Sequence, residues 1–148
     1  MSHRPFTIHL VTQRTAHLLE SVDDDVFDHA VTPDFVRELL SNPFHALFVA
    51  MVEGQVVGMA TGIVHLHPDK PRSLFINEVG VAVRHLRRGI GTQLISSLFE
   101  WGRSQGCVEA WVATDVDNSA AQFFYESTGG IRGEEPAVVY VYSLSDVP

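Results

Sequence analysis

One stretch of the sequence constrains the fold more than any other: a strand pattern, a pair of glycines and a helical pattern, in that order. The strand pattern covers 74–83 (LFINEVGVAV), and Gly89 and Gly91 follow it. Apolar residues then recur at helical spacing over 90–104. A further strand pattern over 107–114 (CVEAWVAT) completes a β-α-β unit, whose two strands we expect to run parallel.

The rest of the chain adds elements on both sides of this unit. Helices are expected over 13–22 and 33–41, and a third that Asn118 caps and that runs to about Ser127. Further strands are expected over 6–11, 46–52, 55–65 and 137–144, with a hairpin turn at Glu53-Gly54. The predicted order is β-α-α-β-β-β-α-β-α-β. This order predicts an α/β fold with a mixed central sheet flanked by helices, in a single domain over residues 1–148.

Charge and composition limit the class of partner. The formal net charge is −8, from 18 acidic and 10 basic residues, which argues against nucleic acid and suits a cationic ligand. No apolar run is as long as a membrane span, and no signal segment is recognised before the first strand pattern. The single cysteine, Cys107, suits a reducing compartment. We therefore expect a cytoplasmic protein that binds no membrane.

The turn before the 90–104 helix has the features of an anion site. It consists of Arg87, Arg88, Gly89, Ile90, Gly91 and Thr92. The first N–H groups of a helix have no partner within the helix, and glycines let a bulky anion approach them. The two arginines and the threonine add further donors, so the turn suits a pyrophosphate. The dinucleotide fingerprint is excluded because position 94 is Leu, and the P-loop lysine is absent as well.

With this turn the sequence resembles the GNAT superfamily of N-acetyltransferases. Their coenzyme A signature, Gln/Arg-x-x-Gly-x-Gly/Ala after the fourth strand, is matched at Gly89 and Gly91, while the leading position is Leu86. A second mark is the helix from Asn118 to Tyr125, with Asn-x-x-Ala-x-x-x-Tyr spacing. The resemblance covers nearly the whole chain. It implies that acetyl-CoA, without a metal, supplies an acetyl group to a primary amine, and that Asn118 and Tyr125 contact the cofactor.

A narrower resemblance is to the class I aminoglycoside 3-N-acetyltransferases. It rests on Pro71-Arg72-Ser73, on Glu78 within the following strand, and on Asp115-Val116-Asp117. It implies an aminoglycoside antibiotic acetylated at its 3-N position, hence a part in antibiotic resistance. Two alternatives stay open. The acceptor is another small amine, a polyamine, an amino acid or a peptide N-terminus, or the chain binds acyl-CoA without catalysis.

Amide formation from an ammonium group needs a base, an oxyanion donor and an acid for the departing thiolate. Glu78 is the candidate base, because the resembling enzymes use an acidic residue on this strand and a bulge before Gly80 would open the sheet there. Tyr125 is the candidate acid, since a phenol is neutral at working pH and can donate its proton. The backbone of Val81, Ala82 and Val83 is expected to pair with the pantetheine arm, and an N–H near Val81 to hold the oxyanion.

Acidic residues and one histidine are the candidates for holding the acceptor amine. Asp115 and Asp117 follow a parallel strand at its carboxyl end, where open sheets place ligands. Asp28 and His29 lie in a loop that also carries the acidic run 23–25, for which a solvated loop is the alternative interpretation. A small cationic amine is thus the expected partner, and the resemblance implies a homodimer.

Overall fold

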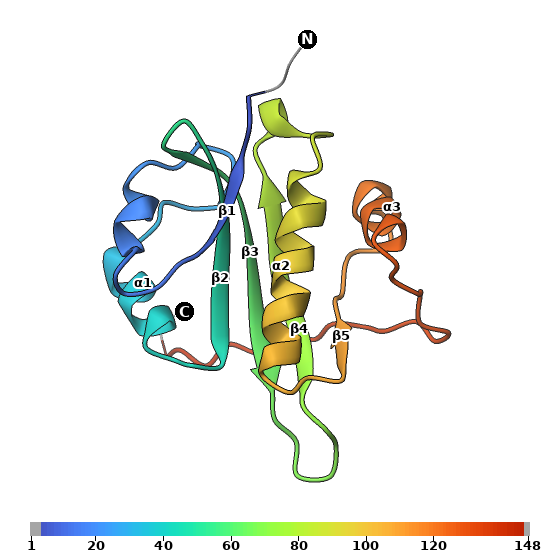
Figure 1. Ribbon diagram of the computed structural model, residues 1–148. Helices are drawn as coiled ribbons and strands as arrows, with labels where there is room; N and C mark the ends of the chain where they lie inside the picture. Colours follow the sequence, from blue (N-terminus) through green and yellow to red (C-terminus); the bar gives the residue numbers. More distant parts are fainter. Residues whose placement is uncertain (1–3, 147–148) are drawn as a thin grey trace. The chain divides into compact units, whose positions relative to one another are not determined.

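The computed structural model describes residues 4–146, which form two compact units. The first unit ends at Ala113 and holds a five-stranded sheet with the strand order β1-β2-β3-β4-β5 (Figure 1). The second unit begins at Thr114 and contains helix α3 (Ser119–Ser127). The single domain over 1–148 stays a prediction. None of the helices in the described residues is long and apolar enough to cross a membrane.

The sheet is mixed, as the sequence predicts. Its strands are β1 (Thr7–Leu10), β2 (His45–Val52), β3 (Gln55–His65), β4 (Ser73–Val81) and β5 (Glu109–Trp111). Neighbouring strands are antiparallel except β4 and β5, which are parallel. The β2–β3 turn takes the predicted hairpin form, because Glu53 and Gly54 both have positive φ angles, 49° and 80°.

Helix α2 (Ile90–Ser104) covers one face of the sheet and agrees with the predicted range (Figure 1). Its buried side chains rest on the glycines of β3. A Cβ added at Gly62 would lie 2.7 Å from Leu98 Cδ1, and one added at Gly58 would lie 3.1 Å from Ile90 Cγ2. The helix therefore approaches the strand this closely because these two positions carry no side chain.

A second apolar layer covers the opposite face. Inward residues of β2 and β3, among them Leu47, Val49 and Met59, are buried there. Helix α1 (Pro33–Leu40) packs its partly buried Val36, Leu39 and Leu40 against this layer. Because side chains alternate along a strand, β3 presents its glycines to α2 and residues 59 and 61 to the α1 side. The candidate site lies on this second side.

Three predicted elements differ in the structure. The helix expected over 13–22 is a 3₁₀ helix, Ala16–Glu20, because Thr15 hydrogen-bonds the Thr12 N–H and Val22 then pairs with Val56. The strand expected over 107–114 is shortened to β5. The strand expected over 137–144 is wrong: this segment carries no strand in the described structure, and its large apolar side chains are 75–97% exposed. Alternation alone does not make a strand, which also needs a paired neighbour.

Candidate active site

Glu78 lies at a bulge in β4. Thr61 of β3 pairs with Glu78, and Gly62 pairs with Ile76, so Asn77 is an extra residue on β4. A bulge of this kind re-aims the side chains beside it and is common next to active sites. The bulge expected before Gly80 is thus present, and it directly precedes the candidate base. Glu78 and Thr61 stand opposite each other, with their side chains on the same face.

A cavity of about 280 Å³ opens on this face, and Glu78, Asp28 and His29 all line it. The loop that follows the 3₁₀ helix contributes Asp28 and His29, and β4 contributes Glu78. The structure therefore brings together three candidate residues that lie up to fifty positions apart in the sequence. The other lining residues come from the same loop, from α1, β2 and β3, and from the 3₁₀ helix: Leu19, Phe27, Ala30, Val31, Thr32, Phe35, Val36, Leu39, Leu47 and Thr61.

The environment of Glu78 tunes its acidity. Burial raises the pKa of the Glu78 carboxyl above its usual value of 4.5, and the negative charge of Asp28 raises that pKa further. Both causes disfavour the ionised form, since neither a drier surrounding nor a like charge stabilises a carboxylate. A carboxylate with a raised pKa binds a proton more strongly, which is what a general base requires.

The loop that carries Asp28 lies directly on β4. A Cβ added at Gly80 would be 2.7 Å from the carbonyl oxygen of Val26, which is closer than real Cβ atoms come. The loop is also bonded to β3, because the N–H of Asp23 donates to the carbonyl of Val56 at 2.9 Å. Because Gly80 has no side chain, the loop can approach β4 this closely. The close approach helps to place Asp28 in the lining of the cavity.

Two residues of the acidic run 23–25 make structural hydrogen bonds, which neither the acceptor-binding nor the solvated-loop interpretation of the run predicted. The carboxylate of Asp23 accepts from Arg84 Nε at 2.6 Å, and its side chain is only 13% exposed. The carboxylate of Asp25 accepts the backbone N–H of Val83 at 2.8 Å. These two bonds tie the acceptor-side loop to the segment that follows β4. Of the acidic residues at 23–28, only Asp28 lines the cavity.

Beyond its first residues β4 has a free edge within the first unit. It pairs with β5 only over Ser73–Phe75, so the stretch from Ile76 to Val81 has no strand on that side among the residues described. This edge is available for an extended ligand, as expected for the pantetheine arm. The backbone expected to pair with the pantetheine arm is shorter than predicted, however. It ends at Val81, because the N–H groups of Ala82 and Val83 already donate to Val57 and Asp25.

The turn before α2 fits a pyrophosphate. Gly89 is the N-cap residue with a φ of 79°, and a Cβ built there would meet no atom within 4 Å, so open space lies beside the helix N-terminus. Arg87 also has a positive φ of 59°, which turns the chain sharply before the cap. Ile90 anchors the first turn in the core, while Gly91 and Thr92 remain partly or fully exposed. The first N–H groups of α2 therefore face accessible space.

Arg88 was expected to donate to the pyrophosphate, but its side chain is bonded within the protein. Its guanidinium donates to the backbone carbonyl of Arg4 and contacts Nδ1 of His85, and its Nε is buried without a partner among the described residues. Burial, more than the neighbouring arginines, lowers the pKa of His85 and so favours the neutral ring, whose Nδ1 can accept a hydrogen bond from Arg88. Arg88 thus ties the turn to the N-terminal segment, and Arg87 is the arginine left exposed.

The remaining candidates belong to the second unit. Asn118 caps α3 as predicted, with its Oδ1 accepting the N–H of Ala121 at 3.0 Å. Tyr125 lies in this helix beside Phe124, with ring centres 5.2 Å apart, and burial raises the pKa of its hydroxyl. Asp115 and Asp117 contribute backbone carbonyls to the start of α3, and their side chains are exposed. Tyr125 therefore keeps its proton at neutral pH, as an acid must.

Thr61 is the lining residue that sequence reasoning missed. Its hydroxyl oxygen is buried and has no hydrogen-bond partner in the described structure. The signal was available, because a threonine on the α1-facing side of an otherwise apolar strand is a polar group in a core position. The position was not singled out because its partner across the sheet, Glu78, is seventeen residues away.

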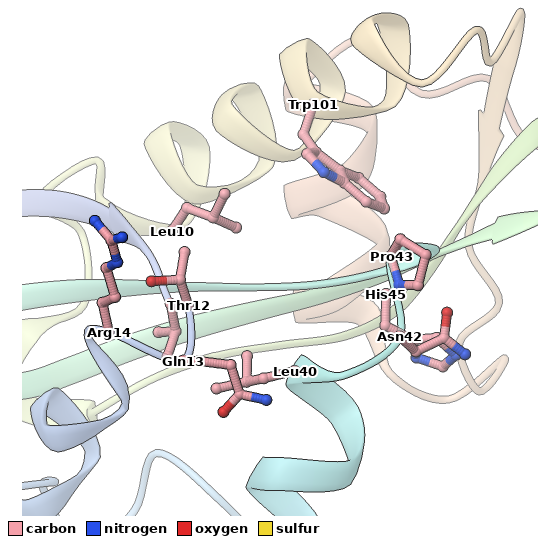
Figure 2. Close-up of a pocket in the computed structure, with 10 residues that line it drawn as sticks. Leu10, Thr12, Gln13, Arg14, Leu40, Asn42, Pro43, His45 and Trp101 are labelled. Atoms are coloured by element: carbon pink, nitrogen blue, oxygen red, sulfur yellow. The ribbon is translucent and has the colours of Figure 1, made fainter.

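A larger cavity of about 490 Å³ lies elsewhere in the first unit and contains none of the predicted site residues. Figure 2 shows its lining side chains, which include Arg14, Asn42, His45 and Trp101. None of its lining residues is acidic. An ammonium group would therefore meet no carboxylate there, and the cavity at Glu78 is the candidate acceptor site.

Comparisons with known proteins agree with this geometry. The sequence model described as the acetyltransferase (GNAT) family matches residues 12–130. N-acetyltransferase family 8 member 3 of Rattus norvegicus is 27% identical over 121 residues, 81% of this chain and 53% of that protein. Aminoglycoside N(6′)-acetyltransferase type 1 of Salmonella typhimurium is 29% identical over 97 residues, 63% of this chain and 67% of that protein. This chain thus spans about half the length of the rat relative.

The fold also matches a solved enzyme. The structure of AAC(6′)-Iy in complex with the bisubstrate analogue CoA-S-monomethyl-acetylneamine superimposes with a TM-score of 0.76 at 22% identity. The match covers 96% of this chain and 99% of that one. The likeness supports the fold predicted from the element order.

Proposed function

Because the chain belongs to the acetyltransferase (GNAT) family, we propose that it transfers an acetyl group from acetyl-CoA to a primary amine. The family predicted from the glycine turn and the Asn118 helix is confirmed. The observation that carries the proposed activity is the position of Glu78. It combines a raised pKa, a place in a cavity and a place on β4, the strand that leads into the pyrophosphate turn.

The first unit supplies binding groups for both reactants. The N-terminus of α2 with Gly89 and Gly91 would hold the pyrophosphate, and the free edge of β4 up to Val81 would hold the pantetheine arm. Bound acetyl-CoA supplies an activated acetyl thioester. The cavity on the other side of the bulge would hold the amine, with Asp28 beside it as the counter-charge.

Proton transfer then divides between two residues. Glu78 takes a proton from the ammonium group, so that the nitrogen lone pair can attack the thioester carbonyl carbon. The carbon–nitrogen bond forms and the carbon–sulfur bond breaks, and the hydroxyl of Tyr125 gives its proton to the departing sulfur. The second proton of the nitrogen leaves to solvent. Exchange with solvent then removes the proton from Glu78 and returns one to Tyr125, so that free coenzyme A, an acetylated amine and one released proton are the products.

An aminoglycoside remains the acceptor that the sequence predicted, and the name of the Salmonella relative supports an aminoglycoside. That name gives the 6′ nitrogen, so we place any aminoglycoside acetylation at a 6′ amine rather than at the expected 3-N position. A part in antibiotic resistance depends on this acceptor. Asp115, Asp117 and His29 keep their proposed place around the acceptor, as does Asn118 near the cofactor.

The test is thiol release from acetyl-CoA across a panel of primary amines, followed by mass spectrometry of the amine. Release that depends on the amine, with a 42 Da gain on it, supports the activity. Binding of acetyl-CoA without any release would identify a non-catalytic acyl-CoA-binding protein instead.

A further inference from the structure

The acceptor cavity is mostly apolar. Of its lining residues only Asp28, Glu78 and His29 are ionisable. Phe27 and, from α1, Phe35 also line the cavity, and Phe35 is 72% exposed. A large aromatic side chain left open beside a cavity is a surface that an apolar group can cover. The remaining apolar lining residues are Leu19, Ala30, Val31, Val36, Leu39 and Leu47.

The polar end of the cavity contains an unmatched hydroxyl. Thr61 stands opposite Glu78 across the β3–β4 pair, and its buried oxygen has no partner in the described structure. A buried hydroxyl without a partner costs free energy, so such a group calls for an explanation. An N–H of the bound amine would give Thr61 its missing bond while a second N–H faces Glu78.

The cavity lining offers little to a polycation, because Asp28 and Glu78 are its only acidic residues. Of the nearby run 23–25, Asp23 and Asp25 are bonded to Arg84 and to the N–H of Val83, and the exposed Asp24 does not line the cavity. An ammonium group beyond the first would lie among the apolar lining residues without a counter-charge of its own from the cavity lining. Desolvating an unpaired charge costs far more than burying a hydrocarbon group gains.

We propose, building on the acetyltransferase activity above and in place of the aminoglycoside acceptor, that the acceptor is a primary amine carried on an apolar alkyl or aryl-alkyl body. The ammonium group lies between Asp28, Glu78 and Thr61. The body lies along Phe27, Phe35 and the rest of the apolar lining. Thr61 acts as a positioning residue that fixes the nitrogen beside the base.

A matched pair of amines tests the acceptor class. Hexylamine and 1,6-diaminohexane have the same length, but the second carries a charge at the end that would meet the apolar lining. We expect kcat/KM for hexylamine to exceed that for the diamine by at least about tenfold. Each methylene from butylamine to hexylamine should raise kcat/KM by about threefold, as expected for buried CH₂ groups.

Variants test the residues. Phe35→Glu should raise the diamine-to-hexylamine ratio of kcat/KM by about tenfold, because it places a carboxylate in the apolar lining. Arg37→Gln changes the net charge by the same amount on the same helix without lining the cavity, and it should leave the ratio unchanged. Thr61→Val should raise KM for hexylamine by about tenfold, and Thr61→Ser should restore it. The thermal shift given by acetyl-CoA should stay the same in both Thr61 variants.

The outcomes separate the two proposals. Faster acetylation of 1,6-diaminohexane or of an aminoglycoside than of hexylamine would overturn the apolar acceptor and leave the acetyltransferase standing. An unchanged KM in Thr61→Val would remove Thr61 from the site. Acetyl-CoA binding without release to any amine of the panel would overturn the activity, and the acceptor class with it.

Discussion

Asp28 and Glu78 come from different elements, a loop and a bulged strand, yet they line the same cavity, and the charge of Asp28 raises the pKa of Glu78. The contact between Gly80 and the carbonyl of Val26 fixes this relationship, because it seats the loop on β4. The strand thus supplies the proposed base, and the loop supplies a charge that raises the pKa of this base.

The first prediction concerns the pH dependence of the reaction. Glu78 acts when ionised, so kcat/KM for one amine should fall as the pH drops through its raised pKa. Asp28→Asn removes the like charge but not the burial. It should therefore move the acidic limb of the profile to lower pH without abolishing it. Asp69→Asn, in an exposed loop outside the cavity, serves as the control. A limb that stays in place, or moves to higher pH, would contradict the pairing of the two carboxyls.

The second prediction concerns stability. A carboxyl whose pKa is raised by folding weakens the folded state wherever it is ionised, and this cost vanishes below its unfolded pKa of 4.5. Glu78→Gln should therefore raise the Tm at pH 7.5, by roughly 1–2 °C, as for a change below about 1 kcal/mol. The difference should disappear near pH 4. Glu109→Gln changes an exposed residue of β5 and should leave the Tm unchanged both at pH 7.5 and near pH 4. A lower Tm for Glu78→Gln at pH 7.5 would show that the carboxylate is structural.

The third prediction concerns the pyrophosphate turn. Acetyl-CoA should raise the Tm of the wild type, since it binds the folded chain. Gly91→Val should remove most of that rise, because its side chain would project where the phosphates approach the first turn of α2. Ser96→Val, exposed one turn further along the same helix, should keep the full rise. Equal shifts in all three proteins would place the cofactor elsewhere.

The fourth prediction concerns the acid. Burial keeps Tyr125 protonated at neutral pH, so removing its hydroxyl removes a proton donor. Tyr125→Phe should lower kcat by about a hundredfold and leave the acetyl-CoA thermal shift intact. Tyr142→Phe makes the same change at an exposed position of the second unit and should keep full activity. Near-normal turnover in Tyr125→Phe would take this residue out of the mechanism.

Local signals in the sequence were enough for several elements. The 90–104 range of α2 followed from apolar spacing and from Gly106, and the start of α3 followed from the capping side chain of Asn118. In both cases the deciding contacts lie within a few residues of each other. The turn at Gly89 was predictable for the same reason, since its φ of 79° strongly favours glycine.

Non-local contacts account for most of what the sequence did not predict. The run 23–25 has the composition of an acceptor site, but Asp23 and Asp25 are bonded to residues about sixty positions away. Arg88 likewise has a side chain suited to binding phosphate, but its guanidinium donates to the backbone carbonyl of Arg4 instead. Segment 137–144 alternates like a strand, yet pairing depends on a distant edge that its own residues do not specify. Thr61 could be identified as a site residue only from the register of β3 and β4, which places it opposite Glu78.

The most direct test of the account is the rate of thiol release from acetyl-CoA with hexylamine in the wild type, Glu78→Gln and Glu109→Gln. The account predicts amine-dependent release in the wild type and in Glu109→Gln, and a loss of about a hundredfold or more in Glu78→Gln with the acetyl-CoA thermal shift retained. Equal rates in the wild type and Glu78→Gln would contradict the role of Glu78 as the base. Absence of release with every amine tested would contradict the activity itself.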